Sequence, residues 1–177
     1  MQFDATIKTI LLDIEGTTTP IDFVYQVLFP YARKHLHAYL NEHWDESQHE
    51  RAQLQHEHAH DVQQGVKPPP LGASQLESVV AYLHWLMDQD RKSTPLKSLQ
   101  GKVWEAGYKS GALKSQLFAD VPRAFDAWQA QGKRIAIFSS GSVLAQKLLF
   151  TYTEHGDLSR FISGCVISAL TSSRRQS

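Results

Sequence analysis

The sequence predicts an α/β protein in which an open parallel sheet forms a core and a helical segment is inserted into that core. Two aliphatic runs, residues 7–12 and 134–138, are too short for helices and apolar on both faces, as strands inside a parallel sheet are. Both runs end in small polar or acidic residues, and a long, mostly helical stretch separates them. The core is therefore expected to hold both runs, and the helical stretch between them is expected to be an insert.

The composition limits what the protein binds and where it acts. The chain has 177 residues with 18 basic and 18 acidic side chains, so its formal net charge is zero and no basic surface for nucleic acid is expected. The single cysteine, Cys165, excludes an intramolecular disulfide and fits a reducing compartment. The first residues lack the pattern of a signal peptide, and no apolar run is long enough to span a bilayer. We expect a cytoplasmic monomer with neither nucleic-acid nor membrane partners.

Hydrophobic spacing gives the first elements of the insert. Residues 21–39 carry apolar and aromatic side chains at three- and four-residue steps and predict a helix, which Pro30 should kink or divide. Residues 41–64 are polar and predict an exposed helix with little to bury. His56 and His60 would share one face of that helix at a spacing used by zinc sites, but a solvated, histidine-rich face is the preferred interpretation.

A proline-rich linker, residues 65–72, interrupts the helical stretch because three consecutive prolines cannot continue a helix. Ser74 and Glu77 then have the spacing of a capping box, which predicts the start of a new helix with an apolar inward face. A further helix is predicted over residues 96–108.

The core continues with alternating helix and strand. Asp120 as N-cap and Gly132 after the last turn bracket a helix that leads into the strand 134–138. Another helix is predicted over residues 143–150.

The first strand delivers two carboxylates, Asp13 and Glu15, into a Gly/Thr turn. Open parallel sheets carry their chemistry beyond the carboxyl ends of their strands. There Asp13 could attack a phosphoryl group, and Glu15 could protonate the leaving group and then activate water. The hydroxyl of Thr17 could bind phosphate oxygens, and Mg²⁺ would offset the repulsion between two acids and a phosphate. The alternative is an ordinary strand end whose acids cap the following turn.

The second strand ends in Ser139, Ser140 and Gly141 just before a helix. Hydroxyls and backbone N–H groups at such a place can bind phosphate oxygens. Taken alone, the pattern also fits a routine N-cap serine. The functional interpretation of each turn is strengthened by the other, because both would lie at strand ends of one sheet. Together the acidic turn and the hydroxyl turn predict a phosphomonoester hydrolase.

Several segments resemble one known family. The string Asp13-Ile14-Glu15-Gly16-Thr17-Thr18 resembles the first motif of the haloacid dehalogenase-like hydrolases, and its Glu in the third place resembles the enolase-phosphatases of methionine salvage. The segments 99–105, 120–122 and especially 139–150 extend the similarity. It covers roughly residues 7–164, and the long serine-containing string is specific to this branch.

The resemblance implies a Rossmann-like core over residues 1–20 and 96–177, incomplete at its C-terminal end, with a helical cap inserted over residues 21–95. It implies that Asp13 is the nucleophile and a Mg²⁺ ligand, and that Glu15 binds the metal through its backbone carbonyl and acts as acid and base. Ser139 and Ser140, with Gly141, would bind the substrate phosphate. The implied activity is that of a phosphoric monoester hydrolase of the acireductone synthase type. Its small-molecule substrate would be the phosphorylated diketone 2,3-diketo-5-methylthiopentyl-1-phosphate, which is enolised and dephosphorylated. The enolisation base is not assigned.

The similarity ends after about Gly164. The family continues with a phosphate-binding Lys and a metal-binding Asp, whereas this chain has no Lys after Lys147 and no Asp after Asp157. We hypothesise a frameshift or premature end, to be tested by sequencing the locus. Loss of one charge-stabilising donor commonly costs about a hundred- to a thousandfold in rate, so impaired activity is expected. An uncovered edge of the first strand would also favour aggregation. Two alternatives stay open: a phosphatase of another small phosphomonoester, and a relative that only binds ligand.

Overall fold

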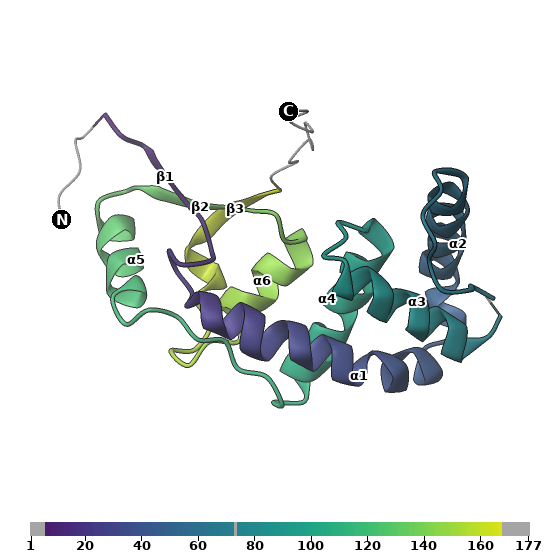
Figure 1. Cartoon of the computed structure of the whole chain (residues 1–177). Coiled ribbons are helices and arrows are strands. Elements are labelled where there is room, and N and C mark those ends of the chain that lie inside the picture. The colour runs from purple at the N-terminus through teal and green to yellow at the C-terminus, as the bar shows by residue number, and fades with distance from the viewer. Residues whose placement is uncertain (1–5, 73, 168–177) are drawn as a thin grey trace. The chain divides into compact units, whose positions relative to one another are not determined.

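The computed structural model describes residues 6–72 and 74–167, which form two compact units. The first unit is drawn from Met1–Gln26 and Gly107–Ser177, and the second is Val27–Ala106. The first unit contains the strands β1 (Thr9–Leu12), β2 (Arg134–Ser139) and β3 (Ile162–Ile167), the helices α5 (Val121–Ala130) and α6 (Val143–Thr151), and the 3₁₀ turn η3 (Ser159–Phe161). The second contains α1 (Phe29–Glu42), the 3₁₀ turn η2 (Asp45–Ser47), α2 (Gln48–Gln63) and α3 (Leu76–Asp88) (Figure 1). The π-helix η1 (Phe23–Leu28) and α4 (Thr94–Lys109) run across the two boundaries between units.

The sheet of the first unit is parallel, with the described strands in the order β1-β2-β3. Leu12 of β1 lies opposite Ile137 of β2, and Ile137 lies opposite Cys165 of β3. The predicted α/β class is confirmed. Both aliphatic runs form strands, as their branched and apolar side chains favour. No residue of β1 is buried, however, so the prediction of a strand buried on both faces is wrong for β1.

One face of this sheet is packed against helices. Ile135 and Ile137 project from β2 into a core that both α5 and α6 share, where the rings of Phe125 and Phe150 lie 6.0 Å apart. The other face carries Leu11 and Phe138, which are 58% and 41% exposed, beside the exposed Val166. Among the described residues, therefore, the sheet is covered on one side only.

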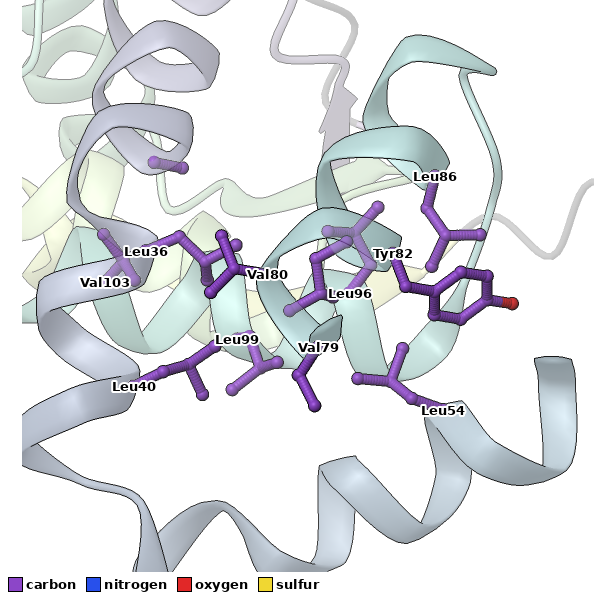
Figure 2. Close-up of a cluster of buried hydrophobic side chains, with 12 residues drawn as sticks. Leu36, Leu40, Leu54, Val79, Val80, Tyr82, Leu86, Leu96, Leu99 and Val103 are labelled. Atoms are coloured by element: carbon purple, nitrogen blue, oxygen red, sulfur yellow. The ribbon is translucent and has the colours of Figure 1, made fainter. Parts of the chain in front are cut away.

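The second unit has a core of its own, built from helical stripes (Figure 2). Leu36 and Leu40 of α1, Leu83 and Leu86 of α3, and Leu99 of α4 are fully buried. Each set recurs at three- or four-residue spacing, which places its members on one helix face. α4 contributes Leu96, Leu99 and Val103 to this core, and for this reason the division between units falls after Ala106 and not at residue 95. The assignment of residues 21–95 as a cap stays a prediction.

Several predicted details of the insert are confirmed. The helical pattern of residues 21–39 is divided as Pro30 requires: the π-helix η1 ends at Leu28, and Pro30 occupies the first turn of α1. Residues 65–72 contain neither helix nor strand. α4 begins and ends within two residues of its predicted bounds.

Two predictions about the insert are wrong. Residues 48–63 form a helix, but it is not merely exposed, because Leu54, Glu50 and Asp61 are buried. The capping box does not form either. Helix α3 begins at Leu76 after an N-cap at Gln75 without a side-chain bond, while Ser78 Oγ bonds the backbone of Gly72 instead.

The structure also bears on the metal and membrane predictions. Within residues 6–72 and 74–167, no group of three or more His, Cys, Asp or Glu side chains is placed to hold a metal ion, around His56 and His60 or elsewhere. None of the helices in the same ranges is long and apolar enough to cross a membrane. The departure from the family begins within β3, and its larger part, residues 168–177, lies outside the described residues.

Candidate active site

The acidic turn begins directly after β1. Asp13 is exposed, and its Oδ1 accepts a hydrogen bond from the backbone N–H of Ile14 at 2.7 Å. The carbonyl of Ile14 accepts from the N–H groups of Thr17, Thr18 and Thr19 at 3.0–3.2 Å. Gly16 has φ = +74°, a left-handed conformation that glycine adopts without strain. Three backbone N–H groups of the turn therefore share one acceptor, the Ile14 carbonyl. The side chain of Ile14 is buried in the core, whereas Asp13 and Glu15 are exposed.

Thr18 and Thr19, at the end of this turn, are both buried. Thr18 Oγ1 lies 3.3 Å from the carbonyl oxygens of both Asp13 and Ile14, between which it can share its proton. Thr19 is fully buried, and its Oγ1 has no hydrogen-bond partner among the described residues. The backbone of Thr18 is held in turn by the N–H of Phe118, which donates to its carbonyl at 3.0 Å.

The electrostatics of the turn follow from placing two acids two residues apart. Partial burial raises the pKa of Glu15 above its ordinary value, and the negative charge of Asp13 raises it further. A carboxyl group with a raised pKa keeps its proton at higher pH, which is the property required of a general acid.

The hydroxyl turn follows β2. Ser139 is buried at the end of the strand, and its Oγ accepts a hydrogen bond from the N–H of Gly141 at 3.1 Å. Ser142 is the N-cap of α6, and its Oγ accepts from the N–H of Ala145 at 3.2 Å. Ser140, between them, is exposed. Backbone N–H groups and hydroxyls thus collect at the N-terminus of a helix, where the helix dipole favours an anion.

The structure brings the two turns together. Asp13 lies one residue beyond Leu12, and Ser139 lies two residues beyond its partner Ile137, on adjacent parallel strands. Adjacent strands are about 4.8 Å apart, so both turns emerge at the same edge of the sheet. Asp13 and Ser139 therefore leave the sheet at the same edge, and Glu15, Thr17, Ser140 and Gly141 follow them in the two turns. Their catalytic and binding roles stay predictions.

The donor set of the acidic turn suits a hard divalent cation. Mg²⁺ binds oxygen ligands, keeps several waters and needs only one or two carboxylates when the substrate supplies phosphate oxygens. The Asp13 carboxylate is exposed, and the bridge between Glu15 and Thr19 uses the carbonyls of Ile14 and Thr19, so it does not occupy the Glu15 carbonyl. The residues present fit Mg²⁺ in this limited sense.

Sequence reasoning missed one residue beside the site. Gln146 of α6 is fully buried, and its Nε2 donates to the carbonyls of Gly141 at 3.0 Å and Val166 at 3.3 Å. A polar residue on the inward face of a short, mostly apolar helix was the available signal. Cys165, by contrast, is half-buried, and this partial burial raises the pKa of its thiol, against a smaller opposite effect of Lys147.

Comparison with known proteins extends these observations. Residues 7–170 match the model of the haloacid dehalogenase-like hydrolases. The chain is 53% identical to Enolase-phosphatase E1 of Synechococcus elongatus over 93% of its own length and 69% of that relative. It is 46% identical to Enolase-phosphatase E1 of Anopheles gambiae over 89% of its own length and 56% of that relative.

A solved structure is similar to this chain in both fold and sequence. The UTR4 protein of Saccharomyces cerevisiae superposes with a TM-score of 0.67 at 34% identity, over 92% of this chain and 67% of that one. Identity of this extent, together with a fold and a strand-end site of the expected kind, shows the family. The chain belongs to the haloacid dehalogenase-like hydrolases, among the enolase-phosphatases.

Proposed function

We propose that the chain carries out the reaction of the enolase-phosphatases with Mg²⁺, as part of methionine salvage in the cytoplasm. Its substrate would be 2,3-diketo-5-methylthiopentyl-1-phosphate and its product the acireductone. The proposal is carried by the adjacency of the Asp13–Glu15 turn and the Ser139–Gly141 turn at the ends of two paired strands. Relatives bearing the name Enolase-phosphatase E1 at up to 53% identity support the substrate assignment.

Enolisation would be a separate proton shift, from carbon to the carbonyl oxygen, by a base that is not assigned. The first half of the dephosphorylation would use both acids. A carboxylate oxygen of Asp13 forms a bond to phosphorus as the bond between phosphorus and the substrate oxygen breaks. Glu15, whose pKa is raised, gives its proton to the departing oxygen. Ser139 and Ser140, with the N–H groups after them, would bind the equatorial phosphate oxygens, which carry the charge during transfer.

The second half would return the enzyme to its starting state. Glu15, now ionised, accepts a proton from water as the water oxygen bonds to phosphorus. The bond between Asp13 and phosphorus breaks, which releases inorganic phosphate and restores the carboxylate. Mg²⁺, held by the Asp13 carboxylate and the Glu15 carbonyl, would neutralise part of the charge between the acids and the phosphate.

The extent of the chain matters for this proposal. It spans 69% of one relative and 56% of another, so the activity of those whole proteins is proposed for this chain and not transferred to it. The expectation that this chain alone has impaired activity likewise stays a prediction.

A phosphate-release assay tests the proposal. The purified chain is given the diketone phosphate and a panel of other small phosphomonoesters, with Mg²⁺ and with a chelator. We expect Mg²⁺-dependent release that Asp13→Asn lowers at least about a thousandfold, since nucleophile loss removes the covalent route. Asp126→Asn, an exposed carboxylate on α5, is the matched control and should retain full activity.

Each departure from that result has its own meaning. Faster release from another phosphomonoester would replace the substrate assignment. Phosphate binding without release would favour a relative that only binds ligand. Release that is indifferent to Asp13→Asn would eliminate Asp13 as the nucleophile.

A further inference from the structure

Gln146 stands out among the buried polar groups of the first unit. It is fully buried in α6, yet its side-chain amide donates hydrogen bonds to groups outside that helix. Its Nε2 donates to the carbonyl oxygens of Gly141, in the hydroxyl turn, and of Val166, near the end of β3. One side chain thereby ties the turn after β2 to the end of the next strand.

We propose that Gln146 is a positioning residue that holds the hydroxyl turn in the conformation required for binding phosphate. The inference rests on the proposed function of that turn. It adds a residue whose amide does not touch the substrate and acts through the backbone of Gly141.

The planarity of the peptide group explains how this action reaches the site. In a trans peptide the C=O and the following N–H point in opposite directions. By drawing the Gly141 carbonyl toward itself, the Gln146 amide turns the N–H of Ser142 the opposite way. The N–H of Gly141 meanwhile bonds Ser139 Oγ at 3.1 Å. The Gln146 bond therefore fixes the peptide on one side of Gly141, while the Ser139 bond fixes the peptide on the other.

The chemistry of the position favours glutamine specifically. Two carbonyl oxygens converge on Nε2, and a primary amide supplies two N–H donors without a charge. An ionised Glu would place its negative charge against both carbonyls. A Leu or Met would fill the space but donate nothing.

The remaining atom of the amide shows that packing alone does not explain this residue. Gln146 Oε1 is buried and has no hydrogen-bond partner among the described residues. An unpartnered buried acceptor is unfavourable for folding, and an apolar side chain of the same size would avoid it. Gln146→Met removes this cost but leaves the carbonyls of Gly141 and Val166 without their donor, so it is expected to fold with a lower thermal midpoint than the parent chain.

The test compares the Kd of inorganic phosphate, measured by titration calorimetry with Mg²⁺ present, in the parent chain and in Gln146→Met. We expect about tenfold weaker phosphate binding, the effect of one lost hydrogen bond, with a raised KM and a lowered kcat. Gln131→Met is the matched control, because exposed Gln131 also donates from Nε2 to a carbonyl, that of Ala127, and lies before the start of β2, at the opposite end of that strand from the hydroxyl turn. It should leave phosphate binding unchanged.

Gln146→Glu gives a second, internal test. A protonated carboxyl donates one hydrogen bond and an ionised one donates none. Phosphate binding by Gln146→Glu, relative to the parent chain at the same pH, should therefore recover between pH 7.5 and pH 5.5. If Gln146→Met does not fold, this comparison decides, and a lack of recovery overturns the inference.

The outcomes separate the inference from the function on which it rests. Unchanged phosphate affinity in a folded Gln146→Met overturns the positioning role and leaves the phosphatase proposal standing. If the parent chain neither binds phosphate nor releases it from any ester, the proposed function fails first and the positioning role falls with it.

Discussion

Leu12 lies opposite Ile137 in the parallel pairing of β1 with β2. This register decides where the chemistry of the chain can occur. A parallel pair shifted by two residues would separate the acidic turn from the hydroxyl turn by about 7 Å along the strands. In the observed register the two turns leave the sheet side by side.

Glu15→Gln is expected to raise the thermal midpoint at pH 7.5. Because burial and Asp13 raise the pKa of Glu15 above its ordinary value of 4.5, the folded chain binds this proton more tightly than the unfolded chain does. Ionising Glu15 therefore lowers stability as pH rises. Glutamine stays neutral and avoids this loss. Calorimetric melts from pH 4 to pH 8 measure the difference.

The pH dependence is the decisive part of that measurement. Below the ordinary pKa, Glu15 is protonated in both states, so the advantage of Glu15→Gln should vanish near pH 4. Exposed Glu154→Gln serves as the control and should show no such trend. A Glu15→Gln melt that matches the parent chain at every pH would rule out repulsion within the acidic turn.

Thr18→Val and Thr19→Val should act in opposite directions. Thr18 Oγ1 donates to the carbonyls beneath the acidic turn, so its replacement should cost about 1 kcal/mol of unfolding free energy. Thr19 Oγ1 is buried without a partner among the described residues, so its replacement by an isosteric apolar side chain should be neutral or stabilising. Urea unfolding of both variants gives the comparison, each serving as the other's control. Equal destabilisation would show that Thr19 Oγ1 has a partner.

Lys102→Met should destabilise the second unit by about 3–5 kcal/mol. Lys102 Nζ lies 2.6 Å from Oε1 of Glu50, whose side chain is only 6% exposed. Burial alone would raise the pKa of Glu50, but the bonds from Lys102 and Ser98 hold it below its ordinary value. Removing Lys102 therefore leaves a buried carboxylate without its counter-charge.

Two comparisons check that explanation. The loss caused by Lys102→Met should shrink as pH falls toward 4, where Glu50 can take up a proton, and Glu50→Gln combined with Lys102→Met should recover most of it. Arg33→Met breaks the exposed pair with Asp88 and should cost less than about 1 kcal/mol. Similar costs for Lys102→Met and Arg33→Met would contradict the role assigned to burial.

Leu11→Thr should reduce aggregation without reducing stability. Leu11 is 58% exposed on the open face of β1, which lies at an edge of the sheet formed by the described strands. Exposed apolar edge strands recruit other chains. We expect less binding of a hydrophobic dye and a slower rise in light scattering, with a change in unfolding free energy within about 0.5 kcal/mol.

The neighbouring residue provides the control for that substitution. Leu12 points to the opposite face and packs against the core of the first unit. Leu12→Thr should therefore cost about 1–3 kcal/mol. Dye binding by Leu11→Thr equal to that of the parent chain would remove the exposed face as the cause of aggregation.

Local patterns predicted the strands and the strand-end turns well. Ile135 and Ile137 are buried by whatever apolar side chains cover the packed face of the sheet. The apolar run that contains them is therefore enough to predict a strand. Pro30 could also be placed from the sequence, because proline has no backbone N–H and is tolerated in the first turn of a helix but not in its interior.

Features that depend on distant partners could not be predicted in this way. Glu50 looks like a surface residue until Lys102 and Ser98, about 50 residues later, pair with it. Ser74 and Glu77 have the spacing of a capping box, but Ser78 bonds Gly72 and another geometry results. Gln146 likewise becomes informative only once the carbonyls of Gly141 and Val166 are known to converge on it.

The long interval between β1 and β2 has a consequence for synthesis of the protein. About 125 residues separate Leu12 from its partner Ile137, so a ribosome working at roughly 5–20 residues per second leaves the nascent β1 without a neighbour for about 6–25 s. The helices of the second unit emerge during this time and can pack locally. During that interval the first strand has no parallel partner, so its apolar side chains stay open to contact with other chains.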